Sequence, residues 1–456
     1  MRTLEPLVLC VAGFVCGSVS RADDWPQWLG PQRDGVWREN DVTDRFPSKG
    51  PKVRWRTPIG AGYAGPAVAG GRIYITDRIL AEGATNPKSA FAKSPVLGKE
   101  RVLCLDEATG KQVWVHEYDC KYEVSYAAGP RTTPVVHQGK VYTLGTMGHL
   151  LCLNASTGKV LWSKSFQEDY DAPVPFWGFA AHPLLDGDKL ICLVGGKAGL
   201  VVAFQKDTGK KIWHALSNAQ IGYCPPMIYQ VGATRQLVIW HPGGIYGLDP
   251  QTGKTYWSYP WKLDQSSMSI STPRYENGRL FVTSFYRGAV TLKLDEEKPA
   301  ASVVWRSKNW KGNSGSEQSK NTDGIQAIMC TPFVHDGYVY GVCSYGQLRG
   351  IKAETGERLW ETFQATSGKE ERWGNAFLVA NGDHFVLFNE KGDLITAKLT
   401  PRGYEEISRA HILEPTNFMA GRPVVWSHPA FANKCVFARN DKELVCVSLA
   451  KEENGQ

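Results

Sequence analysis

The chain has 456 residues, a net charge of +7 at pH 7 and 21% charged residues. This length exceeds one ordinary domain and leaves two domains or one large repeated architecture. The modest positive charge argues against a nucleic-acid-binding protein, because basic residues do not concentrate on one segment. With 42% apolar residues, 47 Gly and 26 Pro, the composition indicates a folded globule with many turns.

The N-terminus has the layout of a secretory signal. Arg2 precedes an apolar stretch from Leu7 to Val15, and small residues follow up to Ala22. The apolar stretch is shorter than the roughly 20 residues that cross a bilayer. Neither Cys10 nor Cys16 follows the small residue that a lipoprotein signal requires. We therefore expect cleavage near Ala22 and a secreted or periplasmic chain without a membrane span.

A first repeated phrase predicts strand–turn–strand units. A Pro begins an alternating apolar run, and a Gly lies five residues after the Pro, where it supplies a hairpin turn. The copies are Thr133-Pro134 with Gly139, Thr272-Pro273 with Gly278, Thr331-Pro332 with Gly337, and Gly65-Pro66 with Gly71.

A second phrase, Asp-x-x-Thr-Gly-Lys followed by Trp, comes after each first one. Together the two phrases make four short strands in about 50 residues, which is the size of one propeller blade. The Trp residues of the second phrase are expected to pack between blades. The copies end at Trp114, Trp162, Trp213, Trp257 and Trp360, and a degenerate copy runs from Leu294 to Trp305.

The repeats predict an all-β, eight-bladed propeller of four-stranded antiparallel blades. The blades start near residues 65, 132, 181, 224, 271, 330, 375 and 428. The last blade lacks a Trp-bearing outer strand, and an orphan copy of that strand ends at Trp55. We expect this N-terminal strand to close the ring beside Cys435 and Cys446, since closure removes sheet edges. The expected segments are 1–22 (signal peptide), 23–52 (lead-in), 53–450 (propeller) and 451–456 (polar tail).

These motifs resemble the pyrroloquinoline-quinone-like (PQQ-like) repeat propellers over nearly all of the mature chain. The segment Asp24-Trp25-Pro26-Gln27-Trp28-Leu29-Gly30-Pro31 looks like the lead-in of such exported proteins. The resemblance implies the propeller fold. It does not imply one activity, because the family includes quinone-dependent dehydrogenases, an outer-membrane assembly lipoprotein (BamB) and members without known activity.

The features of the dehydrogenases are missing from the sequence. They carry adjacent cysteines near the quinone, and their quinohaemoprotein branch carries Cys-x-x-Cys-His; neither occurs here. We therefore interpret the chain as a non-catalytic binding or scaffold platform for a protein or small-molecule partner, without a cofactor. The alternative is a dehydrogenase that uses pyrroloquinoline quinone with calcium. A carbohydrate-handling enzyme is a third class, but no carboxylate pair stands out to support it. Asp169 and Asp171 are the only close carboxylates in a channel loop, and they are the candidates for a base in the quinone-dependent alternative.

The candidate binding face lies on the loops that lead from one blade into the next. The longest are 165–182, 306–329 and 411–427, and aromatic and Arg side chains on exposed loops favour binding. In the alternative interpretation, Trp177 and Trp426 plug the channel. His182 and His428 are read as residues at strand starts, and no metal site is predicted. The candidate residues are Arg131, Trp177, Trp310, Trp373, Arg422 and Trp426.

Two further expectations concern loops and cysteines. The insertion 78–100 in the first blade is polar and predicts a surface loop. Counting outward from two-residue turns at Asp336-Gly337 and Asn440-Asp441 sets two cysteine pairs opposite each other, which permits a disulfide in each. These pairs are Cys330 with Cys343 and Cys435 with Cys446.

Overall fold

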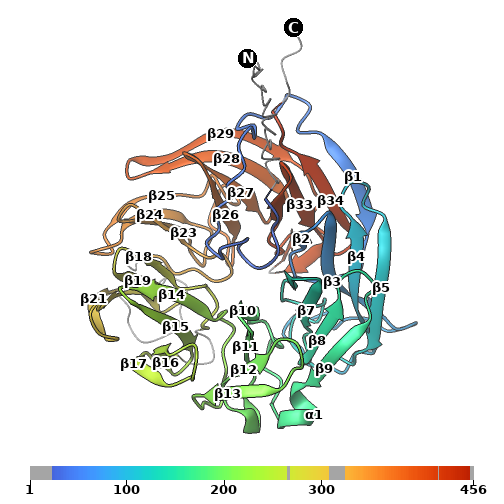
Figure 1. Cartoon of the computed structure of the whole chain (residues 1–456). Helices are drawn as coiled ribbons and strands as arrows, with labels where there is room; N and C mark the ends of the chain where they lie inside the picture. The colour runs from blue at the N-terminus through green and yellow to red at the C-terminus, as the bar shows by residue number, and fades with distance from the viewer. Residues whose placement is uncertain (1–22, 264–267, 308–323, 420, 452–456) are drawn as a thin grey trace, which may run out of the picture.

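The computed structural model describes residues 23–263, 268–307, 324–419 and 421–451. In these ranges the strands form eight four-stranded antiparallel sheets, arranged as blades around a central axis (Figure 1). A separate two-stranded hairpin precedes the last blade. The predicted eight-bladed propeller is confirmed. No helix in these ranges has the length and apolar character needed to cross a bilayer.

Each blade runs from an inner strand at the axis to an outer strand at the rim. Blades 1 to 4 comprise β2 (Ala67–Ala69), β3 (Arg72–Leu80), β4 (Gly98–Asp106) and β5 (Gln112–Asp119); β6 (Val135–His137), β7 (Lys140–Leu144), β8 (His149–Asn154) and β9 (Val160–Ser165); β10 (Leu184–Asp186), β11 (Lys189–Leu193), β12 (Val201–Gln205) and β13 (Lys211–Ala215); and β14 (Met227–Val231), β15 (Thr234–His241), β16 (Gly244–Leu248) and β17 (Thr255–Pro260).

The remaining blades follow the same order, except that the eighth takes its outer strand from the N-terminus. They comprise β18 (Arg274–Glu276), β19 (Arg279–Ser284), β20 (Gly288–Leu294) and β21 (Ala301–Arg306); β22 (Phe333–His335), β23 (Tyr338–Val342), β24 (Leu348–Lys352) and β25 (Arg358–Thr362); β26 (Ala376–Asn381), β27 (His384–Asn389), β28 (Asp393–Thr400) and β29 (Gly403–His411); and β32 (Ala430–Ala432), β33 (Cys435–Arg439), β34 (Glu443–Ser448) and β1 (Val53–Pro58). Between blades lie α1 (Phe166–Tyr170) and the hairpin of β30 (Asn417–Met419) and β31 (Arg422–Val424), and within blade 3 lies a short 3-10 helix, Gly196–Ala198.

The N-terminal strand closes the ring as predicted. β1 pairs antiparallel with β34, and Trp55 lies opposite Cys446. Because β1 is the outermost strand of this blade, the first and last parts of the chain are joined by a hydrogen-bonded sheet (Figure 1). Closure leaves no open sheet edge between the ends of the chain.

The repeated Trp and Gly residues pack on each other across blade boundaries. The Trp55 ring lies over the turn of blade 1 so closely that a Cβ on Gly110 would be 2.6 Å from it. Trp55 Nε1 also donates to the carbonyl of Glu107, at 2.9 Å. The Thr-Gly turn therefore serves two purposes: Gly110 adopts φ +69° and leaves room for the neighbouring ring. The same stacking joins Trp114 to Gly158, Trp162 to Gly209, Trp213 to Gly253 and Trp305 to Gly356.

The lead-in segment crosses one end of the ring before β1 begins, and it is drawn in blue at the centre of Figure 1. Trp25 exchanges backbone hydrogen bonds with Val68 of blade 1. The Arg33 guanidinium is buried and donates to the carbonyl of Pro183, at 3.0 Å, at the start of blade 3. Trp37 donates its backbone N–H to Ala380 of blade 7. The segment thus contacts blades on all sides of the axis.

The surface loop predicted at residues 78–100 is present, but its bounds are narrower than expected. β3 continues to Leu80 and β4 begins at Gly98, so the loop is limited to 81–97. The loop is also tied down, because the carbonyl of Ala90 accepts from the Tyr126 N–H at 2.7 Å and from the Ser125 hydroxyl at 2.9 Å. β3 and β4 each run for nine residues here and pair along their whole length.

Neither predicted disulfide is present; the nine cysteines of the described ranges are free. Asn440 accepts from the N–H groups of Lys442 and Glu443, which makes the turn two residues longer than expected. Cys435 consequently opposes Ser448, and Cys446 opposes Phe437.

At the other predicted pair the Asp336-Gly337 turn is as expected, with His335 opposite Tyr338. The paired region ends at Phe333, before Cys330 is reached. Cys330 donates to the carbonyl of Val342 at 3.5 Å.

Candidate functional site

A pocket of about 900 Å³ opens at one mouth of the ring. Its lining comes mainly from the loops that join successive blades, which is where the sequence placed the candidate face. This volume is at the upper end of the range of ligand sites. The aromatic residues of its lining are Trp28, Tyr63, Phe91, Tyr126, Phe176, Trp177, Tyr223, Phe285, Tyr286, Trp373, Phe377 and Trp426.

The floor of the pocket is closed by the lead-in segment. The Trp28 indole stacks on His182 with ring centroids 4.1 Å apart and meets His428 edge-on at 4.2 Å. Its Nε1 donates to the Thr272 hydroxyl at 3.1 Å. Trp28 therefore lies across the axis of the ring and forms the floor of the pocket.

The two floor histidines are buried and neutral. Burial lowers the pKa of His428 to about 3 and that of His182 well below its ordinary value. His182 Nδ1 accepts from the Thr133 N–H at 2.9 Å, and His428 Nε2 lies 2.8 Å from the Thr133 hydroxyl. Both residues precede strands, as the sequence indicated. Both contact Trp28 through their rings and Thr133 through a ring nitrogen.

One wall of the pocket is a cluster of aromatic rings. Tyr126 stacks on Trp426 with centroids 6.1 Å apart, and Phe91 meets Tyr126 edge-on at 5.3 Å. Phe91 also lies 5.9 Å from Trp373. Phe91 comes from the insertion 81–97, so this loop forms part of the rim.

The opposite wall comes from the loop between blades 2 and 3. Phe176 and Trp177 meet edge-on at 4.6 Å, and Trp177 meets Tyr223 at 5.6 Å. Phe176 is 41% exposed, so this wall presents an aromatic surface to solvent. Lys93 of the insertion lies over the Phe176 ring, at 5.4 Å, which brings the insertion to both walls.

Two arginines supply the positive charge of the pocket. The Arg131 side chain is held by the protein backbone, because its Nη2 donates to the carbonyls of Ser125 and Tyr126 at 3.0 and 2.6 Å. Arg372 is exposed; it lies over the Trp373 ring at 4.5 Å and donates to the Tyr286 hydroxyl at 3.2 Å. Within the described part of the chain, no Asp or Glu belongs to the lining.

The structure brings four of the six candidate residues together and separates a fifth. Arg131, Trp177, Trp373 and Trp426 line the pocket. Arg422 lies behind the Trp426 wall and forms a two-point ion pair with Glu390. Trp310 lies outside the described residues.

Sequence reasoning missed Trp28 and Phe91 as pocket residues. Trp28 sits in a segment that was identified without a role, and Phe91 sits in a short apolar stretch, Ala90-Phe91-Ala92, within a polar loop. The apolar character of that stretch is the sequence feature that could have identified Phe91 as a pocket residue. Asp169 and Asp171, the carboxylates considered for catalysis, do not line the pocket. Asp169 accepts from the Ser165 N–H at the start of α1, and Asp171 pairs with the exposed Lys197.

The fold and this site define a class of protein: an eight-bladed propeller of PQQ-like repeats, closed at one mouth by its own N-terminal segment and hollowed at the other. The chain belongs to the family described as outer membrane protein assembly factor BamB, whose model matches residues 98–313 and 297–455.

Individual relatives are distant. The chain is 22% identical to the outer membrane protein assembly factor BamB of Shewanella oneidensis over 263 residues, which is 57% of this chain and 63% of that protein. The match therefore spans less than two thirds of the relative's length.

Two solved structures show the same fold. BamB from Moraxella catarrhalis is 15% identical with a TM-score of 0.51, over 84% of this chain and 99% of that one. Quinohemoprotein alcohol dehydrogenase from Comamonas testosteroni is 14% identical with a TM-score of 0.59, over 95% of this chain and 82% of that one. At such identities the likeness concerns the fold alone.

Proposed function

We propose that this chain is a non-catalytic binding propeller of the cell envelope, which holds a segment of a partner protein in the pocket at the ring mouth. The observation that carries the proposal is the one-sided aromatic pocket of about 900 Å³. Exposed aromatic clusters on loops are typical of protein-binding surfaces. The description of the family as an assembly factor supports a scaffold role.

The lining favours an extended apolar segment that also carries a carboxylate. Aromatic walls bind apolar and aromatic side chains, while Arg372 offers a charged donor at the rim. Met268 and Met329 lie among these rings, and methionine adapts its shape to different partners. The absence of Asp and Glu from the described lining removes repulsion of an acidic peptide.

The same lining does not fit a calcium-bound quinone, the cofactor used by the dehydrogenases that share the fold. Calcium takes several oxygen ligands, with carboxylates prominent among them. Asn218 and Gln220 are neutral, and no lining residue of the described ranges is a carboxylate. This donor set supports binding in preference to quinone-dependent oxidation.

Selection of peptides tests the proposal. A random peptide library is selected on the purified chain, and the recovered peptide is titrated against the parent protein and the Trp177→Ala and Trp373→Ala variants. We expect peptides with aromatic residues beside Asp or Glu, and at least tenfold weaker binding by each variant. The matched control is Ile212→Ala, an exposed position on the outer strand β13, which should leave the affinity unchanged.

The quinone alternative is tested in parallel. The chain is incubated with pyrroloquinoline quinone and calcium, and dye-linked oxidation of alcohols and sugars is measured. We expect no turnover and no displacement of the bound peptide. Quinone-dependent turnover, or peptides whose binding ignores Trp177 and Trp373, would overturn the proposal.

A further inference from the structure

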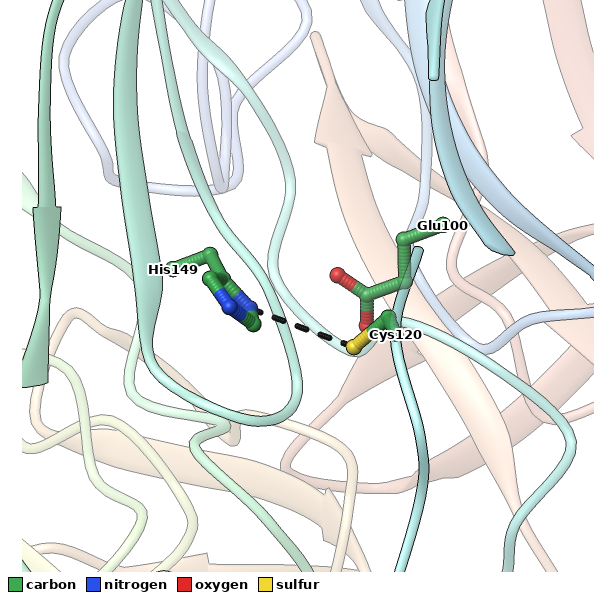
Figure 2. Close-up of side chains that lie close together, drawn as sticks. All are labelled: Glu100, Cys120 and His149. Atoms are coloured by element: carbon green, nitrogen blue, oxygen red, sulfur yellow. Dashed lines mark hydrogen bonds between the residues drawn. The ribbon is translucent and has the colours of Figure 1, made fainter. Parts of the chain in front are cut away.

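A cluster of three side chains that could bind a metal ion lies away from the pocket, between blades 1 and 2. Glu100 comes from β4, Cys120 follows β5, and His149 begins β8. Figure 2 shows the three side chains turned toward one another. One ligand atom from each, a carboxylate oxygen, Sγ and a ring nitrogen, lies within 4.8 Å of the others.

The spacing of these atoms is compatible with a shared metal ion, and it also allows the hydrogen bond between Cys120 and His149 that Figure 2 marks. Cys120 Sγ and His149 Nδ1 are 3.9 Å apart. With Zn–S near 2.3 Å and Zn–N near 2.0 Å, a tetrahedral ion separates its sulfur and nitrogen ligands by roughly 3.6 Å. The observed separation is close to this value. Small side-chain movements would bring all three groups to bonding distance.

Glu100 is a buried carboxylate with no ion pair within 4.0 Å among the described residues, and the buried Arg78, opposite it on β3, interacts with it only at longer range. Glu100 is 1% exposed. Its Oε1 accepts from the Tyr122 hydroxyl and from the Thr146 N–H, whereas Oε2 accepts from the Tyr118 hydroxyl. A carboxylate oxygen has two lone pairs, so Oε2 retains capacity for a cation. Burying such a charge is costly unless it is paired or bound to metal.

The groups around the cluster would hold the ligands in position. The two tyrosine hydroxyls and the Thr146 amide fix the carboxylate, as outer partners do at metal sites. The Tyr118 ring lies 5.0 Å from the His149 ring. Burial raises the pKa of the Cys120 thiol, with the negative charge of Glu100 acting in the same direction. This is the opposite of a nucleophilic cysteine, and it means that a metal ion must displace the thiol proton.

We propose that Glu100, Cys120 and His149 form a binding site for one Zn²⁺ ion, with a fourth position open to water. One thiolate and one carboxylate neutralise the charge of the ion, and imidazole and thiolate are the ligands that zinc prefers. The thiol proton leaves to solvent when the ion binds. Because Thr146 bonds both to Glu100 and to the pocket residue Arg131, at 3.2 Å, zinc would fix the segment that carries Tyr126 and Arg131 into the pocket.

The test uses the tag-free full chain, stripped with a chelator and titrated with zinc against a chromophoric competitor. We expect one tightly bound zinc per chain, with proton release on binding. Cys120→Ala and His149→Gln should each weaken binding at least 100-fold. Cys192→Ala removes another fully buried cysteine and should leave the affinity unchanged.

Cobalt substitution gives a second readout. The parent protein and Cys192→Ala should show a thiolate-to-cobalt charge-transfer band that Cys120→Ala lacks. If Cys120→Ala does not fold, His149→Gln decides, since His149 is only half-buried. Failure of the parent chain to retain zinc at micromolar free metal, or equal affinity in all variants, would overturn the proposal. Peptide binding at the pocket is measured in a separate titration, so failure of zinc binding and failure of the proposed function are distinguishable.

Discussion

Arg422 donates from Nε and Nη2 to the two carboxylate oxygens of Glu390, at 2.9 and 3.0 Å. Glu390 is 2% exposed and also accepts from Trp426 Nε1 at 3.2 Å. Arg422 therefore acts behind the pocket wall: it neutralises the carboxylate that holds the Trp426 indole. The sequence suggested that Arg422 touches the partner, and the geometry gives it a positioning role instead.

Replacing Arg422 should destabilise the fold. Arg422→Ala leaves the Glu390 carboxylate buried without its ion-pair partner, which costs about 3–5 kcal/mol. Urea unfolding measures the change in the free energy of unfolding. The double variant Arg422→Met/Glu390→Gln removes both charges and should recover most of the loss. A change below about 0.5 kcal/mol in Arg422→Ala, within the range of ordinary surface substitutions, would contradict the assigned role.

Removing the floor of the pocket should also be costly. Trp28→Ala deletes a buried indole between two histidine rings and leaves a cavity at the axis, with an expected cost of about 3–5 kcal/mol. Phe176→Ala, at the exposed rim, is the matched aromatic control and should cost less than about 1 kcal/mol. If both variants lose the same free energy of unfolding in urea, Trp28 does not stabilise the fold by filling the axis of the ring.

Blade docking predicts different costs for two glycines with similar backbone conformations. Gly110 and Gly139 have φ of +69° and +74°, so Ala is strained at both. A Cβ on Gly110 meets the Trp55 ring at 2.6 Å, whereas nothing lies within 4 Å at Gly139. Gly110→Ala should therefore lose about 1–3 kcal/mol more stability than Gly139→Ala, because of overpacking. Thermal and urea unfolding of both variants measure the difference, and equal losses would be inconsistent with close Trp55 packing.

The floor histidines predict loss of stability in acid. The pKa of His428 is about 3 in the folded chain and near 6.5 when unfolded, so the unfolded chain binds more protons between these values. The stabilisation is complete above pH 6.5 and falls as the pH drops toward 3, by about 2 kcal/mol at pH 5. Urea unfolding at pH 7 and pH 5 measures it.

The control for acid sensitivity is a neutral side chain. His428→Gln should be less stable at pH 7 but should lose about 2 kcal/mol less than the parent between pH 7 and pH 5. His335→Gln, which changes an exposed histidine, is measured beside it as the control for the substitution itself. An unchanged pH dependence in His428→Gln would disprove the buried neutral state.

The sequence was sufficient for the architecture because the fold repeats. Each Thr-Gly turn with its Trp records one blade boundary, and the orphan strand ending at Trp55 records the closure. The pairing register of two strands was harder to predict, because it depends on the number of residues in the turn between them. The side chain of Asn440 lengthens its turn by accepting from two backbone N–H groups, and the longer turn places Cys446 opposite Phe437 instead of Cys435.

The site was harder to predict than the fold because its residues come from non-repeating segments. Loop aromatics such as Trp177 and Trp373 could be placed near one mouth from blade order alone. The positions of Trp28 and Phe91 depend on how the lead-in and the insertion fold back over the ring, and no periodicity encodes that path. The cluster of Glu100, Cys120 and His149 joins three strand ends of two blades and has no motif spacing.

Photo-crosslinking in the source cells tests the central claim most directly. Benzoylphenylalanine replaces Phe176 at the pocket rim or Ile212 on the outer strand β13; both side chains are more than 40% exposed. The account predicts discrete protein adducts from position 176 that disappear on adding Trp177→Ala and Trp373→Ala or an excess of the selected peptide, and none from position 212. Adducts from position 176 that persist in these pocket variants, or the same pattern from both positions, would contradict it.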